Sequence, residues 1–172
     1  VMEGLMASIV LYLTNPFYQL FATAMGASDF GLGMINALPA LFALFILIPA
    51  AARVDGMSEK KPFVLKMIVW CGALLPACAL APFLGKAGPL VFIVGIAVWN
   101  IPYICYTASW QSYFSDLFAP RERNMPYAWR MAATNGAGLL IVLIGGVILT
   151  YACKTGQQKI WAYQAFFLTA GI

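Results

Sequence analysis

The sequence predicts an all-α polytopic transmembrane helix bundle, with five complete helices and the start of a sixth. Apolar residues make up 63% of the 172 positions and charged residues 9%, against roughly 45–50% and 25% in soluble domains. The apolar stretches are continuous and lack the alternation of barrel strands, so the spanning elements are predicted to be helices. They are also too long and too many for one signal peptide. We therefore expect a lipid bilayer as the surroundings of this chain.

The first half of the sequence predicts three helices. The first covers about residues 2–25, and Asn15-Pro16 interrupts it near its middle. The second covers about residues 31–52, and a charged segment, RVDGMSEKK, follows it. The third covers about residues 62–84 and opens on Pro62, at a helix position where the missing N–H of proline has no cost.

The second half predicts two complete helices and part of another. The fourth helix covers about residues 89–118, and the fifth about residues 125–153. The sixth begins near Ile160 and reaches the last residue after about 20 Å, whereas a span needs about 20 residues and 30 Å. We expect this helix to be cut short, so that residues 1–172 are the N-terminal transmembrane half of a longer chain whose second half is missing.

Internal prolines are predicted to bend the helices rather than end them, because neighbouring helices can satisfy the freed carbonyl groups. They stand at positions 16, 39, 49, 76, 82 and 102.

Basic residues are unequally divided between the two sets of connections. The connections after the second and fourth helices, with the helix starts that follow them, hold Arg53, Lys60, Lys61, Lys66, Arg121, Arg123 and Arg130. The other connections hold Lys86, Lys154 and Lys159. The positive-inside rule places the first set and the N-terminus in the cytoplasm.

Charge, cysteine and carboxylate patterns argue against other classes of protein. The net charge of +4 is spread over connecting loops rather than one stripe, so we expect no nucleic-acid partner. The four cysteines form no CxxC pair and are interpreted as packing residues, with no metal or other cofactor expected. The chain has no histidine, and all six carboxylates lie in loops or at helix ends. We therefore predict no catalytic residue and no enzyme activity.

Polar residues recur at helical spacing on one face of two predicted helices. Helices in lipid keep such groups inward, which predicts a neutral, hydrogen-bonding cavity with aromatic walls and no carboxylate at depth. Such a lining suits a neutral polar or amphipathic solute. The alternative, that these side chains only bond neighbouring helices together, stays open. The polar face of the first helix holds Tyr12, Asn15, Gln19 and Thr23, and the fifth helix adds Thr134 and Asn135. The cavity candidates are Asn15, Tyr18 and Gln19 in the first helix, Asn100, Tyr103, Thr107, Trp110 and Gln111 in the fourth, and Asn135 in the fifth.

A short internal similarity supports the same location. Asn15-Pro16-Phe17-Tyr18 in the first helix and Asn100-Ile101-Pro102-Tyr103 in the fourth form similar motifs that stand 85 residues apart at comparable depth. Transporter halves built from two three-helix repeats place their first and fourth helices equivalently, and interrupted helices there indicate the binding site. Tolerated kinks without function remain the alternative.

Two motifs at one end of the predicted bundle carry a family resemblance. In AARVDGMSEKKPF, Asp55 precedes the basic pair Lys60 and Lys61, and after the fourth helix come Asp116, Pro120, Arg121 and Arg123. With the helix pattern, these motifs resemble the N-terminal six-helix half of a major facilitator superfamily (MFS) transporter. The sequence departs from the family pattern where glycines or basic residues are usual, at Ala51, Gly56, Ser58, Glu59 and Asn124.

The resemblance implies a secondary active transporter, an integral protein of a bacterial plasma membrane. It would move a small solute by alternating access, at a site between this half and the missing C-terminal half. It also implies a cytoplasmic latch in which Asp55 pairs with Arg121 or Arg123 in one conformation, with Lys60, Lys61, Asp116 and Arg130 as further members. We expect Arg130 to pair with Asp116 or to extend to the interface.

Three alternatives to these expectations stay open. The basic loops could serve membrane topology alone. The chain could be a non-transporting membrane subunit or assembly factor. A polytopic membrane enzyme is the third reading.

Overall fold

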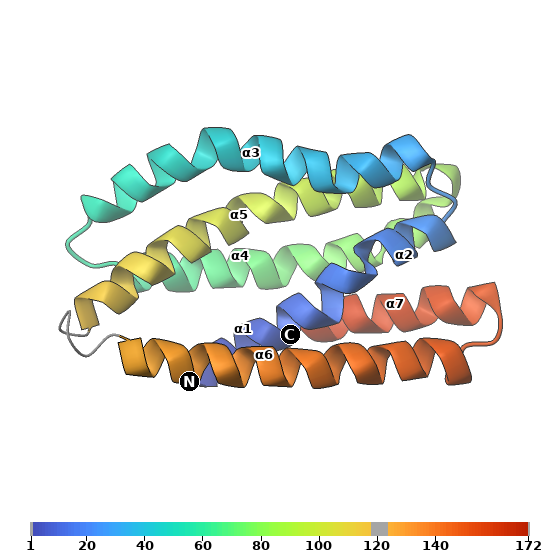
Figure 1. The fold of residues 1–172 in the computed structure, drawn as a ribbon. Helices are drawn as coiled ribbons and strands as arrows, with labels where there is room; N and C mark the ends of the chain where they lie inside the picture. Colours follow the sequence, from blue (N-terminus) through green and yellow to red (C-terminus); the bar gives the residue numbers. More distant parts are fainter. Residues whose placement is uncertain (1, 118–123, 172) are drawn as a thin grey trace.

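A computed structural model describes residues 2–117 and 124–171 of the chain. Over this part, helices run side by side along one direction and no strand is present (Figure 1). The predicted all-α bundle is thereby confirmed. The helices are α1 Met2–Thr14, α2 Tyr18–Ala24, α3 Asp29–Asp55, α4 Lys61–Ala79, α5 Gly88–Leu117, α6 Asn124–Val147 and α7 Gly156–Ala170, with short irregular turns η1 Asn15–Phe17, η2 Ala81–Ala87 and η3 Ile148–Ala152.

The predicted interruption of the first helix is present as the 3-10 turn η1 between α1 and α2. Pro16 has no N–H to donate and its ring crowds the preceding turn, so regular α geometry stops there. Pro39 and Pro49 lie inside α3, Pro76 inside α4 and Pro102 inside α5, and these helices continue through them. Pro82 instead lies in the 3-10 turn η2, just after α4 has ended.

Four helical segments of the described chain are long and apolar enough to cross a membrane. They are Asp29–Asp55, Lys61–Ala79, Ala81–Leu117 and Asn124–Ala152. Large apolar side chains such as Phe30, Ile48 and Phe83 point outward from the bundle and are mostly exposed. Such a surface is expected where the solvent is lipid, since water would make it an association hazard.

The helices pack in two groups, α3 with α4 and α5, and α1 with α6 and α7, and the contact of α4 with α7 connects the two groups. Within them, α5 lies against α3 and α4, and α1 lies against α6 and α7. The N-terminal end of α1, the α3–α4 connection, the end of α5 and the start of α6 share one end of the bundle (Figure 1). Those residues predicted to be cytoplasmic that the structure describes therefore come from one end of the molecule.

An aromatic core joins α2, α5 and α7. Phe21, Phe92 and Phe167 are fully buried, and the ring centroid of Phe21 lies 4.9 Å from that of Phe92 and 5.4 Å from that of Phe167. Between helices in lipid, close packing of this kind replaces the hydrophobic effect as the main attraction.

Small residues let α1 and α6 approach closely. A methyl group added at Gly138 would overlap the ring of Tyr12. Thr134, Gly138 and Gly145 are the buried residues of α6 and lie on one face of it. The contact between α1 and α6 is therefore a small-residue seam, a common form of helix packing in membranes.

Candidate functional site

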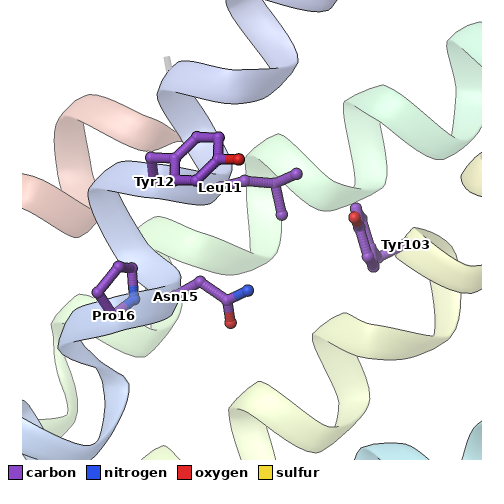
Figure 2. Close-up of a pocket in the computed structure, with 5 residues that line it drawn as sticks. All are labelled: Leu11, Tyr12, Asn15, Pro16 and Tyr103. Atoms are coloured by element: carbon purple, nitrogen blue, oxygen red, sulfur yellow. The ribbon is translucent and has the colours of Figure 1, made fainter. Parts of the chain in front are cut away.

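A pocket of about 410 Å³ lies beside the break in the first helix. Leu11, Tyr12, Asn15 and Pro16 line it from one side, and Tyr103 of α5 lines it from the other. Figure 2 shows Leu11 and Asn15 extending into the space between the first helix and α5, where Tyr103 lies. Pro16 interrupts the regular hydrogen bonding of the backbone, so the carboxamide of Asn15 lies beside a turn that lacks a helical hydrogen bond.

Tyr12 connects the wall of this pocket to α6. Its hydroxyl donates a hydrogen bond to Oδ1 of Asn135, with 2.8 Å between the oxygens. The small residue Gly138, three positions beyond Asn135, provides the room for the Tyr12 ring. Movement of α6 relative to α1 would therefore change the position of a pocket residue.

Tyr103 packs against a buried tryptophan of the same helix. Its ring stacks on Trp99, with 5.1 Å between centroids and 12° between planes. Trp99 is buried, and its indole N–H donates to the carbonyl oxygen of Cys71 on α4 over 3.1 Å. The aromatic wall of the pocket is thus connected by contacts to the α4–α5 interface.

The remaining cavity candidates lie around this pocket without lining it. Asn100 is half-buried one turn before Tyr103, whereas Gln19 and Gln111 are exposed. Thr107 donates its hydroxyl to the carbonyl oxygen of Ile104, a local bond within α5. Trp110 is half-buried farther along the same helix.

Tyr18 belongs to the core of the bundle. It is buried, its ring contacts those of Trp99 and Phe167, and its hydroxyl lies 3.3 Å from that of Thr14. The 3-10 turn rotates the chain between Asn15 and Tyr18, so that these two polar residues face different surroundings. The structure thus brings Asn15, Tyr103 and, through Tyr12, Asn135 together, and it places Tyr18 apart from them.

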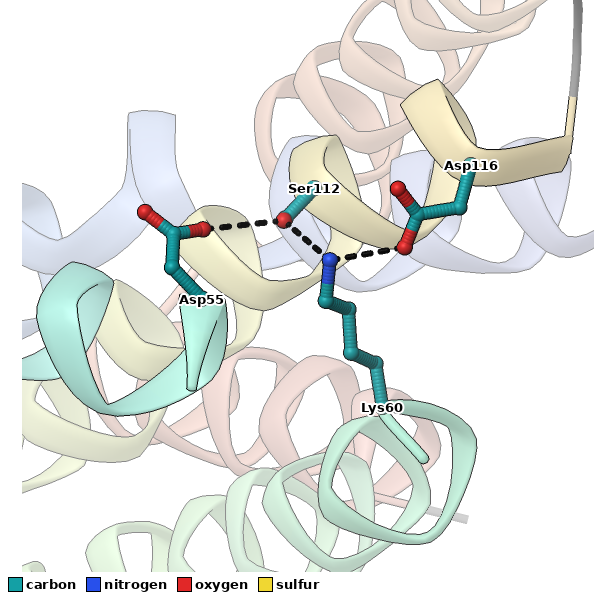
Figure 3. Close-up of polar contacts among 4 residues, drawn as sticks. All are labelled: Asp55, Lys60, Ser112 and Asp116. Atoms are coloured by element: carbon teal, nitrogen blue, oxygen red, sulfur yellow. Dashed lines mark hydrogen bonds and ion pairs between the residues drawn. The ribbon is translucent and has the colours of Figure 1, made fainter. Parts of the chain in front are cut away.

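A polar network joins the ends of three helices (Figure 3). It lies at the end of the bundle where Arg53, Lys60 and Lys61 stand at and beside the α3–α4 connection, which is called the basic end below. The ammonium group of Lys60, which precedes α4, donates to Oδ2 of Asp116 over 2.7 Å and to the hydroxyl of Ser112 over 2.9 Å. The Ser112 hydroxyl donates to Oδ1 of Asp55, the last residue of α3, over 3.2 Å. Three predicted latch residues therefore meet through a serine that we did not predict.

A sequence signal for Ser112 exists. It stands four residues before Asp116 in α5, and this spacing places the two side chains on the same helix face. Of the other latch candidates, Lys61 is exposed. Arg121 and Arg123, the predicted partners of Asp55, lie outside the described residues.

Arg130 has an aromatic neighbour that the sequence did not predict. Its guanidinium carbon lies 3.7 Å from the centroid of the Trp110 ring, a cation–π arrangement across α5 and α6. Trp110 in turn stacks on Phe114, with 5.1 Å between centroids. The side chain of Arg130 is half-buried in this position.

Metal-binding chemistry is not assembled in the part of the chain that the structure describes. Within residues 2–117 and 124–171, no three His, Cys, Asp or Glu side chains come together in a way that could hold an ion.

Comparison with known proteins identifies a family over nearly the whole chain. The family model described as Major Facilitator Superfamily matches residues 4–172. Searches of curated proteins and of solved structures found no match.

Proposed function

Because the chain belongs to the Major Facilitator Superfamily, whose members are membrane transporters, we propose that it carries a small, neutral polar or amphipathic solute across the bilayer. Transport would be secondary active and proceed by alternating access. The pocket at the break of the first helix is the observation that carries the proposal.

The lining of the pocket supports a neutral solute. It offers two phenol groups and one carboxamide, with Leu11 and Pro16 as apolar surface. Neither a carboxylate nor a basic side chain is among these lining residues. Carboxamide and phenol groups both donate and accept hydrogen bonds, so the pocket suits hydroxyl, amide or carbonyl groups beside an apolar or aromatic surface.

A second six-helix half would complete the site. In our proposal it faces the first helix and α5, and the solute lies between the two halves. The localisation that we propose is a bacterial plasma membrane with the basic end of the bundle in the cytoplasm, which the distribution of Lys and Arg supports.

The network of Lys60, Ser112, Asp55 and Asp116 would act as the conformational latch. The Lys60 side chain is 12% exposed and that of Asp116 59% exposed, so one partner is largely removed from water and the other is free to leave. A network of this kind shifts a two-state equilibrium only if its bonds differ between the states. We propose that Arg121 and Arg123 compete with Lys60 for Asp55 and Asp116 when the carrier changes state.

The test is transport by the full-length parent protein reconstituted in proteoliposomes, with a panel of labelled neutral solutes. Asn15→Ala is compared with Asn36→Ala, which removes an exposed carboxamide of α3 outside the pocket. Loss of one hydrogen bond to the solute should raise KM about tenfold in Asn15→Ala. Asn36→Ala should transport like the wild type.

Asp55→Asn provides the second arm of this experiment. It should slow transport while binding of the solute stays as in the wild type, because the residue lies at the end of α3 rather than in the pocket. Absence of transport for every solute under any gradient would argue against a carrier and favour a non-transporting membrane subunit.

A further inference from the structure

A second pocket, of about 380 Å³, lies where the first helix meets η3 and α7. Its walls include Phe17, Leu149 and the ring of Tyr163, and Lys159 and Thr150 are the polar residues on its lining. It shares no lining residue with the pocket at Asn15. The two pockets are therefore separate sites of different character, one neutral and one with a cation.

Irregular backbone creates the space for this pocket. The last turn of the fifth span widens into the π-helical segment η3, and the first helix changes course at the 3-10 turn η1. Gly146 contributes no side chain, and a methyl group added there would meet nothing within 4 Å. π-helical turns are rare in proteins, and those that occur are often found at functional sites.

The position of Lys159 relative to the bilayer follows from its neighbours. Tyr151 and Trp161 are 76% and 62% exposed and stand on the two sides of the η3–α7 connection. Exposed Tyr and Trp side chains at the ends of spanning helices mark the headgroup region. Lys159 therefore lies at headgroup level, whereas Phe17 belongs to the break within the first helix.

Charge at this end favours an anion. The connections at this end of the bundle contain Lys86, Lys154 and Lys159 against one carboxylate, that of Asp29. Lys159 also stands in the first turn of α7, where the helix dipole is unfavourable for a cation and favourable for an anion. A bound anionic group would interact with both.

We propose that this pocket binds an anionic phospholipid, with the phosphate at Lys159 and one acyl chain along Phe17 and Leu149. A volume of 380 Å³ is near the lower end of ligand pockets, which span about 300–1,000 Å³. It can accommodate a segment of one chain, and the rest of the lipid stays in the bilayer. The exposed apolar side chains of Val147 and Ile148 continue the lipid-facing surface beside it.

The experiment is native mass spectrometry of the full-length parent protein titrated with phosphatidylglycerol or with phosphatidylcholine of the same acyl chains. One Lys contact is worth about a fivefold preference for the anionic lipid. Lys159→Gln should remove this preference. Lys154→Gln, which changes a basic residue of the same connection outside the pocket, should keep it.

A second pair of variants tests the chain-binding part of the pocket. Gly146→Leu fills the space and should weaken binding of both lipids, whereas Gly33→Leu, at an equally open position of α3, should not. Gly146→Ala, with a smaller effect in the same direction, serves if the leucine variant does not fold. Thermal unfolding of each variant separates loss of binding from loss of structure.

Three outcomes would overturn the proposal. These are equal binding of the two lipids by the wild type, the same loss in Lys154→Gln as in Lys159→Gln, and unchanged lipid binding in Gly146→Leu. Since none of these measurements involves transport, they stand apart from the test of the carrier.

Discussion

Single residues at the basic end of the bundle form tertiary contacts, in addition to their part in the predicted membrane orientation. Lys60 belongs to the basic pair that the positive-inside rule uses, yet its ammonium group bonds to both Ser112 and Asp116. The neighbouring Lys61 is exposed. Two adjacent lysines with the same effect on orientation therefore have different structural surroundings.

We predict that Lys60→Gln lowers the free energy of unfolding by about 1 kcal/mol, because Asp116 and Ser112 lose a charged donor. The figure stays at the level of an exposed pair, since Asp116 is mostly in contact with solvent and regains water there. Lys66→Gln, which neutralises an exposed lysine of α4, is the control. Thermal unfolding in detergent measures the difference, and equal shifts for the two variants would contradict a structural role for the network.

Among the helices, the contact between α1 and α6 depends on a residue without a side chain. Gly138 and Gly136 are two positions apart on α6 and so face different directions. A methyl group at Gly138 would overlap Tyr12, whereas one at Gly136 would meet nothing within 4 Å. The pair offers a matched comparison on one helix.

Gly138→Ala is expected to destabilise the protein by about 1–3 kcal/mol through overpacking. Gly136→Ala is expected to be neutral or stabilising by about 0.5–1 kcal/mol, since alanine favours helix more than glycine does. Thermal unfolding of both variants is the measurement. If Gly138→Ala also weakens solute binding, the shift of Tyr12 has reached the pocket, and if both variants unfold like the wild type, the small-residue seam does not hold these helices.

The two ends of the molecule differ in their number of basic residues, and this makes the orientation testable. The N-terminal end of α1, the α3–α4 connection and the start of α6 lie at one end, and the connection from η3 to α7 lies at the other (Figure 1). Seven of the ten Lys and Arg residues belong to the first set of connections and helix starts. We predict that this end is cytoplasmic.

Cysteine labelling in intact cells measures this orientation. In a variant with its native cysteines replaced, Gln157→Cys should react with a membrane-impermeant maleimide from outside. Ser58→Cys should react only after the cells are permeabilised. The reverse result would show that the positive-inside rule fails for this chain and that the network at Lys60 faces the outside.

Much of the helical pattern could be predicted because its causes are local. Continuous apolar runs demand helices in lipid, and Pro16 interrupts one of them whatever surrounds it. For the candidate site, the sequence predicted which types of residue would be involved, but not which of them line one pocket. Asn15 and Tyr103 line the pocket, but Tyr18, which shares the same motif, is buried against Trp99 and Phe167.

The sequence by itself determined that the chain is a bundle of membrane helices, where the first helix breaks and which connections are basic, since these depend on neighbouring residues along the chain. Only the tertiary structure decided which polar groups share a pocket and that Ser112 links Asp55 to Lys60. Such contacts depend on how each helix is rotated about its axis and which helix lies beside it. Packing between residues far apart in the sequence sets both, and no local pattern encodes it.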